Sequence, residues 1–380
     1  MSSPFYLIQS IMKQFVIVAD DKIPGLPTLL APFEQVTFLP TKNFSSSAIK
    51  DANVLFVRTP IKCNPALLEG NKVEYIGTAS IGFDHIDRSY CAAHDIVWNN
   101  APGCNKGSVL SYFLATLSIL ARKMKKDLSE FTVGVVGVGN IGKHIAKACS
   151  DLGMKVLLND PPRQEAEGDQ GFVSLEEIAK ECDLVTFHTP LTKDGGHPSY
   201  HVADHRFFSA LEKKPIIMNA ARGGVLDEEA LLEAFKNGKI GGMIIDCWEN
   251  EPLINEELLD IADIATPHIA GFSRDGKFNG TKMTVAAFAR YFGLNVDTSL
   301  ITPPVPKHPV IDVNQIDGDI LTGIILKTYP VEEESEALKA ASSDFVKQRD
   351  HYPLRRDFCG YTVINAPADI EVLIRKLGFN

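Results

Sequence analysis

Short apolar runs alternate with helical patterns along the N-terminal part of the chain. The runs have the length and the β-branched content that are typical of buried strands. We expect strands at residues 15–19, 36–39, 54–57, 73–77 and 96–98. Between them the spacing of apolar residues predicts helices at residues 26–32, 47–51, 65–69 and 87–94. Strands that alternate with helices indicate a small parallel α/β sheet.

The same alternation resumes after a long helical pattern at residues 104–126. A buried strand is expected at residues 132–136, followed by a helix at 140–152. Further strands are predicted at residues 156–158, 184–188, 216–219, 242–246 and 264–266. The intervening helices are predicted at residues 175–181, 203–211 and 228–237. This second α/β domain should bind its ligand at the carboxyl ends of its strands.

The pattern changes beyond residue 290, where prolines 303, 304, 306 and 309 mark an irregular connection. The remaining elements are expected to form an α+β domain. They are a helix at 317–328, an acidic turn at 332–336, a helix with Arg349, Arg355 and Arg356 near its end, a strand at 360–365 and a helix at 368–377.

The expected division of the chain follows from these patterns. It is a disordered extension at 1–11, a substrate-binding domain at 12–108 with a return segment at about 272–290, a nucleotide-binding domain at 109–271 and a C-terminal domain at 291–380.

Composition and charge narrow the class of protein. Apolar residues make up 45% of the 380 residues and charged residues 23%, which is ordinary for a globular protein. The formal net charge of −10 argues against nucleic acid and against an anionic membrane as partners. No apolar run approaches the length of a membrane span, and the N-terminus lacks the basic region of a secretion signal. Seven scattered cysteines without a C-x-x-C pair favour a reducing, cytoplasmic compartment.

A glycine-rich turn joins the expected strand at 132–136 to the helix that follows. Gly137, Gly139 and Gly142 have the spacing G-x-G-x-x-G, which permits a tight turn, a close approach to a pyrophosphate and close packing of helix on strand. The next strand leads to Asp160, where such folds place the carboxylate that binds the ribose hydroxyls of NAD. Pro161 rather than a basic residue follows Asp160, which favours NAD over NADP.

Three polar residues follow separate predicted strands of this second sheet. They are Arg222, Glu251 and His268. A histidine can take a hydroxyl proton while hydride leaves the same carbon. A carboxylate can orient the imidazole, and an arginine can bind a substrate carboxylate in a bidentate way. Taken singly, Arg222 could be a surface ion-pair partner, Glu251 a carboxylate at a helix N-terminus, and His268 a core histidine. Together they predict the oxidation of a 2-hydroxy acid.

The motifs that contain these residues resemble those of the D-isomer-specific 2-hydroxyacid dehydrogenases. The resemblance is carried by VGVVGVGNIG, FHTPLT, NAARGGVLDEEAL, DCWENEP and TPHIAGF. It implies a Rossmann-type NAD-binding domain and a flavodoxin-like substrate-binding (lid) domain. It also implies that Arg222, Glu251 and His268 are catalytic, and that Asp246 orients the nicotinamide carboxamide. The residues that it implies for NAD contact are Gly137, Gly139, Asn140, Ile141, Gly142, Asp160, Thr189, Ala220, Ala221, Asp246 and Gly271.

One branch of that family, which acts on a small phosphorylated hydroxy acid, is more similar still. VRTPIKCN, GTASIGFDHID, APGCN and the C-terminal tail carry this likeness. It implies substrate contacts from Thr59 and Ser80, and a homodimer formed through the C-terminal domain. Phe272 stands where the branch commonly has a Tyr that reaches the substrate, Ser111 where a Glu is usual, and Ser80 where Thr is more common.

Two alternatives to this branch stay open. One is another member of the family, acting on 3-phosphoglycerate, glyoxylate or hydroxypyruvate. The other is a non-catalytic NAD-sensing scaffold on the same fold.

Two further groups of side chains have a less definite role. Arg58 and Lys62 flank Thr59 and could bind a phosphate, and Arg355 or Arg356 could reach one across a dimer. The histidines at positions 197, 201 and 205 are four apart, a spacing that metal sites on helices use. Glycines 195 and 196 and Pro198 disfavour a helix there, and no acidic or Cys residue completes a ligand set, so we expect no metal.

Overall fold

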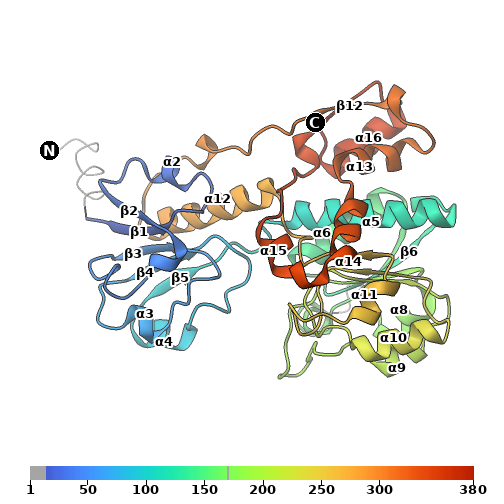
Figure 1. Cartoon of the computed structure of the whole chain (residues 1–380), viewed down its shortest axis with the longest axis horizontal. Coiled ribbons are helices and arrows are strands. Elements are labelled where there is room, and N and C mark those ends of the chain that lie inside the picture. Colours follow the sequence, from blue (N-terminus) through green and yellow to red (C-terminus); the bar gives the residue numbers. More distant parts are fainter. Residues whose placement is uncertain (1–13, 169–170) are drawn as a thin grey trace. The chain divides into compact units, whose positions relative to one another are not determined.

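The computed structural model of the chain describes residues 14–168 and 171–380, and the chain divides into two compact units (Figure 1). The first unit comprises the described residues up to Asn105 together with Ser273–Pro304. The second comprises Lys106–Phe272 and Val305–Asn380. The extension predicted at residues 1–11 lies outside the described residues.

The first unit contains a five-stranded parallel sheet. Its strand order is β2-β1-β3-β4-β5, which is the flavodoxin-like order, so the predicted fold of this domain is confirmed. All the strands predicted here exist, with ends that lie within two residues of the predicted ones. They are β1 (Val16–Asp20), β2 (Gln35–Leu39), β3 (Val54–Val57), β4 (Tyr75–Thr78) and β5 (Val97–Asn99).

Helices of the first unit cover this sheet. They are α2 (Leu26–Leu30), α3 (Pro65–Leu68), α4 (Arg88–Ala93) and α12 (Arg274–Tyr291). The helix α12 comes from the return segment and inserts Phe288, whose ring packs against those of Phe15, Phe56 and Tyr75. The helix predicted at residues 47–51 is wrong, because the chain forms turns there. The amides of Ala48 and Ile49 both donate to the Ser45 carbonyl (3.0 and 3.2 Å), which closes a turn that does not continue as a helix.

The second unit contains a six-stranded parallel sheet of order β11-β10-β9-β8-β6-β7. An isolated parallel bridge between Leu158 and Phe172 adds a rudimentary strand outside β7. Counted with that bridge, the order is the 3-2-1-4-5-6 arrangement of a Rossmann fold with one further strand, as the sequence predicts. The strands are β6 (Thr132–Val136), β7 (Lys155–Asn159), β8 (Leu184–Phe187), β9 (Ile216–Asn219), β10 (Gly242–Ile245) and β11 (Ile264–Ala265).

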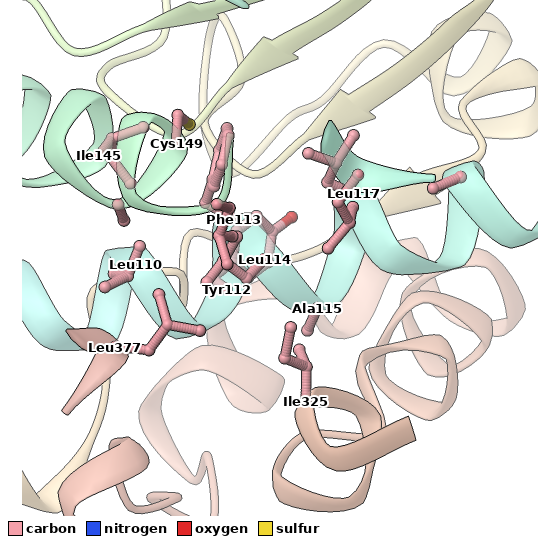
Figure 2. Packing of buried hydrophobic residues seen from close by; sticks show 14 of the residues in the cluster. Leu110, Tyr112, Phe113, Leu114, Ala115, Leu117, Ile145, Cys149, Ile325 and Leu377 are labelled. Carbon is pink, nitrogen blue, oxygen red and sulfur yellow. The ribbon is translucent and has the colours of Figure 1, made fainter. Parts of the chain in front are cut away.

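The longest helix of the second unit is buried over most of its length. Side chains of α5 from Ser108 to Ala121 are buried, as expected for a helix that other elements cover on several sides. Figure 2 shows α5 between Ile145 and Cys149 of α6 on one side and side chains of the C-terminal segment on the other. The helices up to β11 are α5 (Lys106–Met124), α6 (Asn140–Asp151), α7 (Pro161–Glu167), α8 (Leu175–Glu181), α9 (His205–Ser209), α10 (Glu228–Lys236) and α11 (Glu256–Ile261).

The C-terminal segment of the second unit mixes helices with a small parallel strand pair. Its elements are β12 (Val310–Asp312), α13 (Ile320–Thr328), α14 (Val331–Ala340), α15 (Phe345–Asp350), β13 (Thr362–Ile364) and α16 (Ala368–Leu377). Because α13 and α14 pack on α5, and α16 on α6, this segment clusters with the nucleotide-binding part. A separate domain at 291–380 that forms a dimer stays a prediction.

Short 3₁₀ turns occur in both units, at 41–43, 128–130, 298–300, 313–315, 342–344 and 358–360.

Two predictions for the C-terminal segment are wrong. The acidic stretch at 332–336 is not a turn but the first part of α14, where carboxylates are favourable beside the helix N-terminus. Val331, Ser335 and Leu338 form the buried face of that helix. The next helix, α15, ends at Asp350, before Pro353, so Arg355 and Arg356 lie in an irregular segment. In the described part of the chain, no helix is both long and apolar enough to cross a membrane.

Candidate active site

The three glycines of the turn between β6 and α6 serve two different purposes. Gly137 has φ +86°, and a Cβ there would lie 2.7 Å from the backbone nitrogen of Thr189. A Cβ at Gly142 would lie 2.0 Å from the carbonyl oxygen of Gly137. A Cβ at Gly139, by contrast, would meet no atom within 4 Å. The turn therefore needs Gly137 and Gly142 for its own packing, while Gly139 keeps open the space before the α6 N-terminus.

The residues around this turn fit NAD. Asp160 directly follows β7, and its Oδ2 accepts a hydrogen bond from the Val138 amide (2.7 Å) and its Oδ1 one from the Arg163 amide (3.1 Å). Each oxygen keeps a second lone pair that a ribose hydroxyl can use. Thr189 Oγ1 is buried and has no hydrogen-bond partner among the described residues. A free hydroxyl, an acidic strand end and a helix N-terminus are what a dinucleotide requires.

A basic residue, Arg163, also lies beside Asp160. Arg163 belongs to the first turn of α7, a helix that was not predicted. Its Nη1 donates to the Val138 carbonyl (2.9 Å) and its guanidinium also pairs with Glu167. Because the guanidinium is held by these two partners, the prediction that the carboxylate of Asp160 selects against a ribose 2′-phosphate stays open.

A histidine–carboxylate pair follows β10 and β11, the two strands at the edge of the sheet opposite β7. The Nδ1 of His268 is 3.0 Å from Oε1 and 2.9 Å from Oε2 of Glu251. Burial raises the pKa of Glu251, but the bond and charge of His268 and the Trp248 amide outweigh it, so the pKa is lowered overall. An ionised Glu251 accepts the Nδ1 proton, which leaves Nε2 as the basic nitrogen of the ring.

The backbone at His268 has the unusual φ of +57°, in the left-handed region. Asp246 holds it there: Oδ1 accepts from the Ile269 amide (2.7 Å) and from Thr266 Oγ1 (2.7 Å), and Oδ2 accepts from the Ala270 amide (3.0 Å). Burial is the main cause of a raised pKa at Asp246. Asp246 is 1% exposed, and the Sγ of Cys247 also donates to its Oδ2 (3.8 Å), so its carboxyl group accepts four internal hydrogen bonds. Its contact with nicotinamide stays a prediction.

Arg222 follows β9 in a loop that touches the one carrying Glu251. The amide Nδ2 of Asn219 donates to the carbonyls of Arg222 (3.0 Å) and Cys247 (2.9 Å), so one side chain links both loops. A Cβ at Gly223 would lie 1.7 Å from the Trp248 carbonyl oxygen, which makes this close approach specific to glycine. Arg222 Nη1 donates to the carbonyl of Ala221 (2.7 Å).

The charged residues of this site also shift the pKa of a buried thiol, that of Cys247. Burial raises the pKa of Cys247 well above its ordinary value, Asp246 and Glu251 raise it further, and Arg222 and Arg349 lower it. The ligand atoms of Cys247, Glu251 and His268 lie within 4.8 Å of one another, a separation that a metal ion could bridge. A thiol that stays protonated is a poor metal ligand, and Glu251 is already bonded to His268. This geometry suits acid–base chemistry better.

The expected substrate residues Arg58, Thr59 and Ser80 belong to the first unit, where they follow the neighbouring strands β3 and β4. Arg58 Nε donates to Asp20 Oδ1 (2.8 Å) and Nη2 to Thr41 Oγ1 (2.8 Å), so this cation is already paired. Thr59 is exposed, and the Ser80 hydroxyl donates to the Gly82 carbonyl (3.0 Å).

Phe272, the fourth of these expected residues, is the last residue of the second unit before α12 and is half-buried.

The C-terminal segment contributes residues that sequence reasoning missed. Arg349 of α15 places Nη1 3.9 Å from Glu251 Oε2. Arg355 is buried and bonded to backbone carbonyls, so the prediction that it reaches a substrate phosphate is wrong. The histidines at 197, 201 and 205 each contact a different carboxylate, respectively of Glu165, Glu249 and Glu233.

The chain is similar to known proteins. Residues 118–270 match the family model described as D-isomer specific 2-hydroxyacid dehydrogenase, NAD binding domain. An erythronate-4-phosphate dehydrogenase of Bacteroides thetaiotaomicron is 46% identical over 349 residues, which are 92% of this chain and 99% of that protein. A protein of the same name from Escherichia coli O1:K1 / APEC is 36% identical over 370 residues, covering 96% and 98% of the two chains.

Solved structures are similar over a smaller share of this chain. The NAD-bound 3-phosphoglycerate dehydrogenase of Entamoeba histolytica matches with a TM-score of 0.60 and 25% identity, over 73% of this chain and 95% of its own. The D-lactate dehydrogenase of Aquifex aeolicus, complexed with NAD and lactic acid, gives 0.55 and 25% over 73% and 96%. Both are covered almost whole, so this chain carries additional residues. The family match and the NAD-bound neighbours establish NAD as the cofactor.

Proposed function

Because this chain belongs to the D-isomer specific 2-hydroxyacid dehydrogenase family, we propose that it oxidises 4-phospho-D-erythronate at C2 to 2-oxo-3-hydroxy-4-phosphobutanoate. The reaction reduces NAD and forms a step in the biosynthesis of pyridoxal 5′-phosphate, vitamin B6. The relatives named erythronate-4-phosphate dehydrogenase, which match this chain over nearly their whole length, support the choice of substrate. The observation that carries the chemistry is the contact between His268 Nδ1 and both oxygens of Glu251.

His268 is the proposed general base. Its Nε2 takes the proton of the C2 hydroxyl, and Glu251 stabilises the imidazolium that results. When bound, NAD accepts the hydride that leaves C2. Arg222 binds the C1 carboxylate and polarises the carbonyl that develops at C2.

The residues proposed to hold NAD surround the glycine turn and the strand ends. They are Gly137, Gly139, Asn140, Ile141, Gly142, Asp160, Thr189, Ala220, Ala221, Asp246 and Gly271.

Other parts of the proposal concern the substrate contacts and the assembly. Thr59 and Ser80 bind the substrate, Arg58 contacts it with a guanidinium that also stays paired with Asp20, and Phe272 lines the site without offering a hydroxyl. The enzyme acts in the cytoplasm as a homodimer formed through the C-terminal segment. A net charge of −10 and a substrate of low molecular weight fit a metabolic enzyme that binds neither nucleic acid nor membrane.

A spectrophotometric screen tests the proposed substrate. The purified protein is offered NAD with 4-phospho-erythronate, 3-phosphoglycerate, D-lactate or glycerate, and NADH formation is followed. A 2-oxo acid is added in parallel reactions, because tightly bound NADH would otherwise limit the enzyme to one turnover. The highest kcat/KM is expected with 4-phospho-erythronate. A preference for 3-phosphoglycerate or glycerate overturns the substrate but keeps the reaction, whereas no reduction of NAD with any of them favours an NAD-sensing scaffold.

A further inference from the structure

Arg355 reaches from the C-terminal segment into the core of the nucleotide-binding part. Its Nη1 donates to the carbonyls of Phe272 (2.7 Å) and Ile269 (3.3 Å), and its Nη2 to those of Ala270 (2.7 Å) and Ser108 (3.0 Å). The residue is 9% exposed. Burying a charged arginine costs free energy unless its donors find acceptors. Four backbone carbonyls match the two terminal nitrogens, while the buried Nε has no hydrogen-bond partner among the described residues.

Three of the four carbonyls belong to the segment that follows His268. The amides of Ile269 and Ala270 in the same segment donate to Asp246, from the side of the sheet. Amides of this short stretch therefore donate to the carboxyl group of Asp246, which follows β10. Its carbonyls accept from Arg355 of the C-terminal segment. Without Arg355 these buried carbonyls would lose a charge-assisted partner.

The guanidinium is itself fixed by aromatic residues. It lies 4.0 Å from the ring centroid of Tyr329, and Nη1 also donates to the hydroxyl of Tyr352 (3.0 Å). The hydroxyl of Tyr329 bonds to Glu334 of α14, which places a carboxylate in the same network. These contacts leave the guanidinium little freedom to move, so it can act as a rigid template for the segment 269–272.

We propose that Arg355 is a positioning residue, through which the C-terminal segment holds the catalytic histidine in its reactive conformation. The strained φ of His268 must be maintained by its surroundings, and Arg355 fixes the three carbonyls that follow it. The family model ends at residue 270, so Arg355 is no part of the shared nucleotide-binding domain. The role of Arg355 rests on the proposed function, in which His268 is the base.

Substitution of Arg355 by Met tests this role, since Met fills much of the same volume but donates no hydrogen bond. We expect kcat to fall about a hundredfold, because a displacement of about 1 Å at the reacting groups costs that much. The KM for NAD and the Kd for NADH should stay within about twofold of wild type, because the glycine turn and Asp160 are untouched. Arg355→Lys keeps the charge and some donors and should restore part of kcat.

Lys347→Met is the matched control. Lys347 lies in the same segment, on α15, and its side chain is 72% exposed. This variant should keep both kcat and stability. If Arg355→Met is folded, melts at a lower temperature and keeps kcat within about twofold, Arg355 only stabilises the core and the proposal is wrong. If Arg355→Met does not fold, Arg355→Lys decides, and a wild-type kcat in that variant overturns the proposal.

The two proposals can fail separately. The ratio of kcat between variant and wild type is measured with whichever 2-hydroxy acid the wild-type protein oxidises fastest. A different best substrate changes the proposed function but leaves this ratio meaningful. A protein that oxidises no 2-hydroxy acid removes the base that Arg355 is said to position, and overturns both.

Discussion

The pair of His268 and Glu251 shows how one contact sets the protonation of a site. The Trp248 amide donates to Glu251 Oε1 (2.9 Å), and Arg349 faces Oε2, so three donors or cations surround the carboxylate. They keep its pKa below the ordinary 4.5 in spite of burial. The carboxylate is therefore ionised throughout the neutral range, and the imidazole has a fixed acceptor for its Nδ1 proton.

Glu251→Gln should lower kcat for hydroxy-acid oxidation about a hundredfold, the size of a general-base contribution. The amide cannot stabilise an imidazolium, and it can accept the Nδ1 proton only through its single oxygen. Because the pKa of Glu251 is lowered, the loss should persist at every pH above about 4.5. Steady-state rates over a pH series check this. The exposed Glu257→Gln on α11 is the control, and a loss of less than about threefold in Glu251→Gln would contradict the assigned role.

Substitution of Gly139 should weaken cofactor binding without changing the stability of the protein. Its φ is −77° and a Cβ would meet nothing within 4 Å, so Gly139→Ala should not change the melting temperature. The added methyl group would instead occupy space in front of α6 that a pyrophosphate needs. We expect the Kd for NADH, measured by fluorescence titration, to rise at least about tenfold, because 1.4 kcal/mol of steric cost suffices.

Gly196→Ala is the control for that experiment, because Gly196 is another glycine at which a Cβ would meet no atom within 4 Å. It should change neither the melting temperature nor the Kd. If Gly139→Ala binds NADH as tightly as wild type, the dinucleotide does not lie against this turn.

Among the secondary-structure elements, those with a clear apolar period could be predicted from the sequence. The strands β3 and β9 and the helices α8 and α16 have the predicted bounds, because apolar runs or regular spacing define them. The segment at 47–51, predicted as a helix, is a run of turns, and its short apolar pattern could not distinguish the two. The acidic start of α14 looked like a turn because its buried positions, such as Val331 and Leu338, are far apart among the glutamates.

Part of the candidate site could also be predicted from the sequence. Arg222, Glu251 and His268 follow strands, and parallel strands bring their carboxyl ends to one edge. Arg349 and Arg355 could not be assigned, since no local pattern shows which loop a distant arginine will contact. Their roles depend on how α13, α14 and α15 pack on the nucleotide-binding part, and tertiary packing of this kind leaves no periodic signal in the sequence.

The start of α10 contains a carboxyl group that should make stability depend on pH. Burial, above all, raises the pKa of Glu228 to about 7, the nearby Glu249 and Glu251 also raise it, and the Glu249 amide and His201 oppose the shift. A carboxyl whose pKa is raised on folding stabilises the folded state fully below its unfolded value near 4.5. That contribution is lost as the pH rises through about 7, because the group must then ionise while buried.

Glu228→Gln should remove this dependence. We expect the unfolding free energy of wild type to fall by up to about 3 kcal/mol between pH 4.5 and 8. The unfolding free energy of the variant should change much less over the same range. Urea unfolding at several pH values measures it. Glu229→Gln, at the exposed neighbouring position, should follow the wild-type curve. Parallel curves for wild type and Glu228→Gln would show that Glu228 is ionised throughout.

For the molecule as a whole, the packing of the C-terminal segment predicts how cooperatively the second unit unfolds. The C-terminal segment covers α5, with Ile325 of α13 and Leu377 of α16 packed on the side opposite α6 (Figure 2). A segment that shares its core with the NAD-binding part should unfold together with it. A tail that was tethered only by its proline-rich connection would instead melt by itself.

Ile325→Ala distinguishes these two cases. The side chain is fully buried, so its truncation should cost about 3 kcal/mol, whereas Val372→Ala at an exposed position of α16 should cost less than about 0.5 kcal/mol. Calorimetry with and without NADH gives the readout. If the core is shared, Ile325→Ala lowers the melting temperature of the transition that NADH raises, because a ligand stabilises only the cooperative unit that binds it. A new transition at lower temperature, insensitive to NADH, would mean that the C-terminal segment folds independently, and that Arg355 could be withdrawn from the histidine segment without unfolding the NAD site.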